Sequence, residues 1–450
     1  MMEQHEHTHD LVMQISALVE AQNHLEVKNR LANCHSAEIA HVLESLPPEQ
    51  RHIVWQAIAA DTEGNVLLLV NDDVRSGLIE SMGNDELIAA AENLETDDLA
   101  DIIPDLPETV TDELLRSMDK QDRQRLESVL QFPEDTAGGM MNVDTITLRP
   151  DVSLDVVLRY IRFRGNLPEM TDNLFVVGRD NKFLGAISVS SLLTHAPSLT
   201  VAEVLNTGVK SITANTSSTD VAKIFQQWDL VSAPVTDDNE MLLGRITIDD
   251  VVDIIRGQAD HTFLSHAGLD EEDDMFAPVV LSTRRRSVWL GVNLLTALLA
   301  SWVIGQFDAT IEKLVALAVL MPIVASMGGI AGSQTLTLVI RGMATGTVVS
   351  ANRQALIRKE ILIGILNGIL WSLVVGLIAY VWFDNTSLGL IIGAAILFNL
   401  IIAAIAGATI PLVLRKLGAD PALAGSVVLT TITDVAGFFA FLGLAAAFLV

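Results

Sequence analysis

The sequence predicts a multidomain protein with an α-helical superhelical N-terminal domain, an α/β tandem of two related repeats, and a five-helix transmembrane domain. Three observations indicate this division. Acidic residues concentrate before residue 281, a short sequence pattern occurs twice between about 140 and 255, and long apolar stretches follow residue 287. We expect domains over 1–131, 132–255 and 287–450, with a connecting helix and linker over 256–286.

The charge of the chain is divided unevenly. Residues 1–280 hold 18 Lys and Arg but 50 Asp and Glu, whereas residues 281–450 hold 10 and 6. A surface this acidic excludes nucleic acid as a partner, because phosphates require a basic face. Carboxylate oxygens are natural ligands of divalent cations, although a solvated acidic surface is the simpler interpretation for most of these charges.

The first domain is predicted to be all-helical. Apolar residues recur at helical spacing, as at Ile39, Val42 and Leu43, and the pattern is interrupted by turn residues such as Pro47-Pro48 and Gly83-Asn84. Short helices separated by such turns favour a superhelical stack.

The tandem is indicated by an internal repeat. Phe183–Ser188 resembles Leu242–Thr247 at an offset of 59 residues. Each copy is predicted to contain a short strand, a helix, an apolar strand, a polar turn, a second strand and a second helix. A helix after the second copy is expected to lead toward the first membrane span, and the acidic run 270–274 is expected to be a solvated loop.

Five stretches reach the length and apolarity of a membrane-spanning helix. They are roughly Val288–Gln306, Leu314–Ile340, Ile361–Phe383, Leu388–Leu414 and Ala424–Val450. With alternating spans, nine basic residues lie on one side: Arg284, Arg285, Arg286, Arg341, Arg353, Arg358, Lys359, Arg415 and Lys416. Basic loops stay in the cytoplasm, so we expect an inner (cytoplasmic) membrane protein whose acidic N-terminal domains are cytoplasmic.

The most informative residue is Asp434, an aspartate within the last apolar stretch. A carboxylate at that depth is costly unless water, a cation or a partner compensates its charge. Thr430, Thr431 and Thr433 lie beside it and suit a hydrated path, so we interpret Asp434 as part of a cation-conducting site. One carboxylate is a poor divalent site, and a two-fold homodimer would supply two.

Small and polar residues also fill the second span over 326–334. Glycines and serines at this depth serve either close helix packing or a pore lining. The sequence leaves both interpretations open.

The repeat, with its strands and helices in this order, resembles a tandem of CBS domains, a regulatory module. The resemblance implies that a Ser/Thr-x-x-Asp pattern after the second strand meets the ribose of a nucleotide such as ATP. Thr247 and Asp250 fit this pattern, whereas the first copy has Ser188 and Ser191 and lacks the acid. Nucleotide binding is therefore expected in the second copy only.

The whole chain resembles an MgtE-type magnesium channel or transporter. Four strings carry the resemblance: residues 132–140 (FPEDTAGGM), 244–250 (GRITIDD), 417–421 (LGADP) and 431–437 (TITDVAG). It implies that Asp434 contacts hydrated Mg2+ in a pore at a homodimer axis, and that Asp420 lies near one mouth of that pore. It further implies that cytoplasmic carboxylates bind Mg2+ as a sensor and favour a closed state, at Asp97, Asp101, Asp229, Asp250 and Asp253.

Two departures from the family pattern concern these roles. Ile330 stands where the second span commonly has Asn, and the connecting helix has Gln258, His261 and Thr262 at places that are usually acidic. Weaker gating by Mg2+, or gating through fewer sites, follows from these changes.

The function predicted is therefore a magnesium-selective channel that imports Mg2+ and is closed by cytoplasmic Mg2+. A coupled secondary transporter of divalent cations would use the same aspartate and is the alternative. No enzyme is expected, because the sequence lacks a phosphate-binding glycine loop with its lysine, a nucleophile elbow and zinc-ligand spacing.

Overall fold

The computed structural model describes residues 2–92, 94–168, 170–265, 268–269 and 274–449, without the side chains of 2–7, 96 and 97. The chain divides into two compact units. One comprises Met1–Asp260 with Glu272–Pro278, and the other comprises His261–Glu271 with Val279–Val450. Each unit has its own hydrophobic core.

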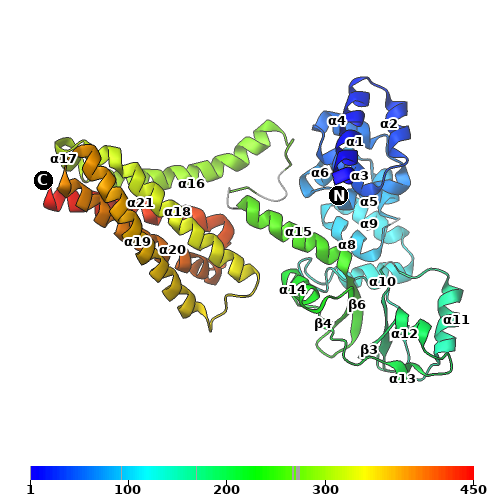
Figure 1. Cartoon of the computed structure of the whole chain (residues 1–450). Helices are drawn as coiled ribbons and strands as arrows, with labels where there is room; N and C mark the ends of the chain where they lie inside the picture. Colours follow the sequence, from blue (N-terminus) through cyan, green and yellow to red (C-terminus); the bar gives the residue numbers. More distant parts are fainter. Residues whose placement is uncertain (1, 93, 169, 266–267, 270–273, 450) are drawn as a thin grey trace. The chain divides into compact units, whose positions relative to one another are not determined.

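The first unit begins with a stack of short helices, drawn in blue to cyan in Figure 1. They are α1 (Met2–Glu20), α2 (His24–Leu31), α3 (Ser36–Glu44), α4 (Pro48–Trp55), α5 (Ala60–Leu69), α6 (Asp72–Ser81), α7 (Asn84–Ala91), α8 (Thr96–Ile102), the 3-10 turn η1 (Ile103–Asp105), α9 (Glu108–Ser117) and α10 (Lys120–Val129). The predicted helical domain is confirmed. Several of its helices start where the sequence places Pro, Asn or Asp, as at Pro48 and at the Asn71 cap of α6.

Two arginines bind consecutive helix pairs in the same way. Arg51 Nε donates to the carbonyl eight residues earlier at 2.8 Å, and Arg75 Nε does so at 3.0 Å. In both cases Nη2 also donates to the carbonyl five residues earlier, at 3.0 and 3.3 Å. These carbonyls lie at helix C-termini, where the backbone lacks partners. The repeated contact fixes the turn between successive helices.

Arg51 also forms a buried ion pair. Its two terminal nitrogens lie 3.0 and 3.2 Å from the carboxylate oxygens of Asp274, and the two side chains are only 7% and 5% exposed. The expectation of a solvated loop is wrong for Asp274, because the partner that buries it lies 223 residues away in sequence. Residues 270–273 of that acidic run lie outside the described residues.

Two three-stranded sheets confirm the predicted tandem. The first copy contains β1 (Thr147–Leu148), α11 (Leu154–Arg164), β2 (Asn173–Val177), β3 (Phe183–Ser188) and α12 (Val189–Thr194), followed by α13 (Val201–Val204). The second contains β4 (Ile212–Thr213), α14 (Ser218–Trp228), β5 (Ser232–Thr236), β6 (Leu242–Thr247) and α15 (Ile248–Ser265). In each sheet the first strand is parallel and the third antiparallel to the middle strand. The same register shift follows Val176 and Val235, 59 residues apart.

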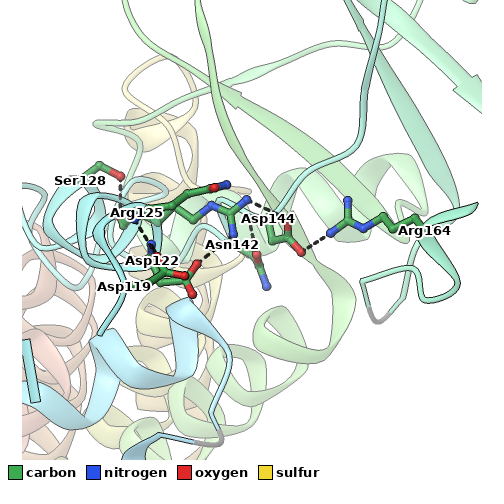
Figure 2. A network of polar contacts seen from close by, with 8 residues as sticks. Asp119, Asp122, Arg125, Ser128, Asn142, Asp144 and Arg164 are labelled. Carbon is green, nitrogen blue, oxygen red and sulfur yellow. Dashed lines mark hydrogen bonds and ion pairs between the residues drawn. The ribbon is translucent and has the colours of Figure 1, made fainter. Parts of the chain in front are cut away.

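The helical stack meets the first repeat through a charged network (Figure 2). Asp119 accepts hydrogen bonds from the backbone at the start of α10. Arg125 of the same helix binds Asp122 and Asp144 at 3.2 and 3.3 Å. Arg164, at the end of α11, binds the other oxygen of Asp144 at 2.7 Å. Asp144 therefore connects the last helix of the stack to the first helix of the tandem.

The string at residues 132–140 folds as a tight loop against the second repeat. Gly138 N donates to Ala214 O at 2.8 Å, and a Cβ at Gly138 would lie 2.4 Å from Phe132 Cγ. A Cβ at Gly139 would lie 2.4 Å from the Pro133 carbonyl oxygen. Both glycines are thus required by close approach within the loop.

The second unit contains five helices of membrane-spanning length among the described residues. They are α16 (Val279–Gly305), α18 (Ala316–Ala344), α19 (Arg353–Phe383), α20 (Thr386–Lys416) and α21 (Pro421–Phe448), with the short α17 (Asp308–Lys313) after α16. The five predicted stretches are confirmed as helices that are long and apolar enough to cross a membrane. Four helices extend further toward their basic ends than predicted, because Arg and Lys continue a helix well. α20 lies at the centre of the bundle and has the most buried residues.

Removing Arg51 should destabilise the contact between α4 and residues 274–278. We expect Arg51→Ala to cost about 3–5 kcal/mol locally, since it leaves the Asp274 carboxylate buried and unpaired. Hydrogen–deuterium exchange of the full chain should show faster exchange in α4 and at 274–278. Arg75→Ala is the matched control, and it should cost less because its acidic partners are partly exposed. Unchanged exchange in Arg51→Ala would contradict the assignment.

A second prediction concerns Glu63 in α5, which is 7% exposed and has one carboxylate oxygen without a hydrogen-bond partner among the described residues. Burial, and then the charge of Glu86, raises the pKa of Glu63. The charged form therefore opposes folding, and the stability present below the unfolded pKa is lost as pH rises through the folded pKa. We expect Glu63→Gln to slow amide exchange in α5 at pH 7 relative to the native chain, but not near pH 4. Faster exchange at pH 7 in the variant would be inconsistent with this.

Candidate cation-conducting site

Asp434 lies on an open groove of about 820 Å³ between α18 and α21. The groove is lined by Ala325, Ser326, Gly329, Ile330, Ser333, Gln334, Thr337, Leu338, Arg341, Thr430 and Asp434. Polar residues of α18 recur at helical spacing, at Ser326, Ser333 and Thr337, so that they share one face of the helix. The carboxylate is half-buried in the single chain. The structure thus places Asp434 opposite the small and polar stretch that the sequence left ambiguous.

The glycines of α18 divide between the two interpretations. Gly329 lines the groove, and a Cβ there would meet no atom within 4 Å. Gly328 and Gly332 instead face the interior, where a Cβ would lie 2.2 Å from Asn399 Nδ2 and 2.8 Å from Leu429 Cδ1 respectively. One glycine therefore shapes the groove, whereas the other two allow close helix packing.

The three threonines beside Asp434 have different roles. Thr430 lines the groove and donates its hydroxyl proton to Ser426 O at 2.9 Å. Thr431 donates to its own helix in the same way, and Thr433 is fully buried. Only Thr430 therefore contributes to the groove, where its hydroxyl oxygen presents lone pairs and not a proton. Such an oxygen suits the water shell of a cation, whose waters donate hydrogen bonds.

The charge of Asp434 has no ion-pair partner in the described part of the chain. Arg341 lines the same groove, but it belongs to the last turn of α18. Within the described residues no three His, Cys, Asp or Glu side chains lie close enough to hold a metal ion together. A metal site at Asp434 thus requires waters, hydroxyls or a second chain.

Ile330 also lines the groove and is 59% exposed. The change from Asn, which the family commonly has at this position, to Ile therefore alters the lining of the groove. An apolar side chain replaces an amide oxygen that could contact a cation or its waters.

Asp420 caps the first turn of α21. Its Oδ1 accepts a hydrogen bond from Ala422 N at 2.9 Å, and its Oδ2 lies 3.5 Å from His261 Nε2. Both residues belong to the second unit. His261, one of the departures in the connecting helix, thus lies next to an acid predicted to bind metal. An imidazolium there would compete with a cation for Asp420.

The predicted sensor acids lie on three helices of the first unit. Asp101 is exposed on α8, Asp229 is the left-handed C-cap of α14, and Asp250 and Asp253 are on the first two turns of α15. Asp97 is also on α8, but its side chain lies outside the described residues. The fold brings none of the described acids into a set of three, so their role as sensors stays a prediction.

Thr247 and Asp250 are brought together by the end of β6 and the first turn of α15. Thr247 Oγ1 donates to Asp250 Oδ2 at 3.3 Å. In the first copy Ser188 Oγ donates to Ser191 Oγ at 3.0 Å, so the geometry is the same but the carboxylate is missing. The predicted difference between the two copies is thus present in their geometry. Nucleotide binding at Thr247 and Asp250 stays a prediction.

One polar cluster of the membrane unit was missed by the sequence analysis. Glu360 is buried on α19 and accepts a hydrogen bond from Thr335 of α18 at 3.1 Å. Glu360 follows Lys359 near the start of a span. In the sequence it therefore resembles an ordinary charged residue at a solvent-exposed helix end. The remaining signal was the polar Asn367 seven residues later, which lies two helical turns away on the same face.

Comparison with known proteins identifies the domains. The MgtE family model, described as a divalent cation transporter, matches residues 321–444. The MgtE intracellular N domain model matches 34–135, and the CBS domain model matches 137–198 and 201–257. These matches fall on most of the membrane unit, most of the helical stack and both repeats.

Similar proteins match over nearly the whole length. The magnesium transporter MgtE of Bacillus subtilis is 24% identical over 440 residues, 98% of either chain. The magnesium transporter MgtE of Thermus thermophilus is 26% identical over 422 residues, 92% of this chain and 93% of that one. A crystal structure of the cytosolic domain of the Mg2+ channel MgtE in complex with ATP aligns at 23% identity with a TM-score of 0.49, covering 54% of this chain and 99% of that one. The chain belongs to the MgtE family, and it contains that family's N domain, CBS pair and membrane domain.

Proposed function

We propose that the protein is a homodimeric Mg2+ channel of the inner membrane, in which the Asp434 carboxylates of two chains face one hydrated ion. The observation that carries the proposal is the open groove around Asp434, whose lining includes serine, threonine and glutamine side chains. A half-buried carboxylate without an ion-pair partner in the described residues needs a cation or a second surface beside it. The similarity to proteins named magnesium transporter MgtE supports Mg2+ as the ion.

The chemistry of the groove suits an ion that keeps its water. Mg2+ dehydrates reluctantly and is usually held by one or two carboxylates together with several waters. Two copies of Asp434 would supply two negative charges to balance the ion. The hydroxyls and amide of the lining, among them Thr430 and Gln334, would accept hydrogen bonds from its waters. A site of this kind binds without the full dehydration that would trap the ion.

The direction of flow follows from charge. Basic residues at the ends of α18, α19 and α20 indicate that residues 1–278 are cytoplasmic. A membrane potential of 100 mV, negative inside, then favours entry of a divalent ion by roughly 4.6 kcal/mol. Passive import needs no further energy source, which separates this proposal from a coupled transporter of divalent cations.

Regulation is proposed to reside in the acidic first unit. The carboxylates of Asp101, Asp229, Asp250 and Asp253, with that of Asp97, repel one another when the cytoplasmic parts of the dimer approach. Bound Mg2+ would remove this repulsion and stabilise a compact, closed state. Differential binding of Mg2+ to the two states would set the open fraction.

Neutralising Asp434 should abolish the conduction. In liposomes that contain the full-length protein, we expect Asp434→Asn to lower voltage-driven Mg2+ influx at least about tenfold. A tenfold change corresponds to a free-energy difference of about 1.4 kcal/mol. Asp384→Asn is the matched control, because Asp384 caps α19 in the left-handed conformation that Asn also accepts. Full influx through Asp434→Asn would refute the role of Asp434. Influx by the native protein that requires a Na+ or proton gradient would instead support coupled transport.

Neutralising the sensor should raise the Mg2+ concentration that closes the channel. We expect Asp250→Asn combined with Asp253→Asn to raise it about fivefold or more, within the usual range of coupling energies. The measurement is Mg2+ flux in liposomes with Mg2+ varied on the face that carries the first unit. Asp155→Asn, an exposed acid on α11 outside the proposed sensor, should leave closure unchanged. Equal closure in the double variant and the control would place the sensor elsewhere.

A further inference from the structure

A second polar cavity lies in the membrane unit, between α18, α19 and α20. It has a volume of about 160 Å³. Its polar lining consists of Gln334, Thr335, Lys359, Glu360 and Asn367. Gln334 lines both this cavity and the Asp434 groove, so the two lie on neighbouring faces of α18.

Glu360 is the buried charge of this cavity. Its side chain is 4% exposed, and Oε2 accepts the hydrogen bond from Thr335. Oε1 has no hydrogen-bond partner among the described residues, and it has almost no solvent-accessible surface. A carboxylate oxygen buried without a partner costs several kcal/mol, so something must compensate it.

Lys359 compensates this charge poorly. Its Nζ lies 3.8 Å from Glu360 Oε1, and 64% of its side chain is exposed. Adjacent residues of a helix point in directions about 100° apart and do not face each other. The ammonium is therefore largely exposed and keeps most of its water.

The cavity can hold a cation with part of its water shell. A volume of 160 Å³ exceeds the space that several waters need. The oxygen atoms available as metal ligands are a carboxylate oxygen, a hydroxyl oxygen and the amide oxygens of Gln334 and Asn367. All are hard oxygen ligands, which select hard metal ions over soft ones.

We infer that Glu360, with Thr335, forms a second cation site that takes a hard, partly hydrated metal ion and that Lys359 partly blocks. Mg2+ and Na+ share the required chemistry. The site is distinct from Asp434 and does not depend on the proposed channel function. When a metal ion binds, it satisfies Glu360 Oε1, and the Lys359 ammonium turns into solvent.

The test is equilibrium dialysis of the purified full-length protein against Mg2+ or Na+, followed by elemental analysis. We expect Glu360→Gln to bind one metal ion fewer per chain than the native protein, in at least one of the two salts. The salt in which the loss occurs identifies the ion. An equal number of bound ions in both proteins, in both salts, overturns the proposal.

Lys359→Gln provides an independent test that does not remove a ligand. Loss of an ammonium 3.8 Å from Oε1 should lower the half-saturating concentration of the ion roughly fivefold or more, because the competing charge is gone. A purely structural Lys359–Glu360 ion pair predicts unchanged or weaker binding, and that result would also overturn the proposal. This variant decides the matter if Glu360→Gln does not fold.

Discussion

The cost of a carboxylate inside a membrane bundle is the constraint on which the rest of the second unit depends. In the described part of its own chain, Asp434 has no basic ion-pair partner. It also does not belong to a group of three His, Cys, Asp or Glu side chains that could hold a metal ion. It lies instead on an open groove whose lining combines Ser, Thr, Gln and Gly residues with the apolar Ile330 and Leu338. In the interior of the bundle, the Asn399 amide nitrogen and the Thr335 hydroxyl each donate a hydrogen bond, to Val324 O and to Glu360 Oε2. At the groove, the chain therefore needs another component, an ion or a second chain, to balance the charge of Asp434.

The helices that form the groove are held by ordinary packing. Gly328 leaves room for Asn399, whose amide donates to Val324 O at 2.9 Å and so connects α20 to α18. A similar close approach brings Gly407 of α20 to the backbone of α18. These contacts fix α18 from behind and leave its polar face turned toward Asp434. The face of α18 that packs against α20 and the polar face that lines the groove are therefore specified by alternating positions of the same short stretch.

Much of the fold could be predicted because its signals are local. Apolar length identifies the five spans, helical spacing identifies the stack, and the pattern shared by Phe183–Ser188 and Leu242–Thr247 identifies the tandem. Asp434 could be singled out for the same reason, since an acid within an apolar stretch is conspicuous in the sequence alone. The similar geometry of Thr247 with Asp250 and of Ser188 with Ser191 also followed from spacing.

The features that were missed depend on partners distant in sequence. Asp274 had the pattern of a solvated acid until Arg51, more than 200 residues earlier, was found beside it. Glu360 was concealed by its neighbour Lys359, because only the packing of α18 against α19 shows that one is buried and the other is not. The directions of the three threonine hydroxyls likewise depend on helix geometry and not on composition.

The most direct measurement of the central claim is a cryo-electron microscopy map of the protein in lipid nanodiscs with Mg2+. The account predicts a two-fold dimer with density for a hydrated ion between the two Asp434 carboxylates, in a water-filled path lined by Thr430 and Gln334. Asp434 side chains that face acyl chains, or that lie far apart with no aqueous connection, would contradict it.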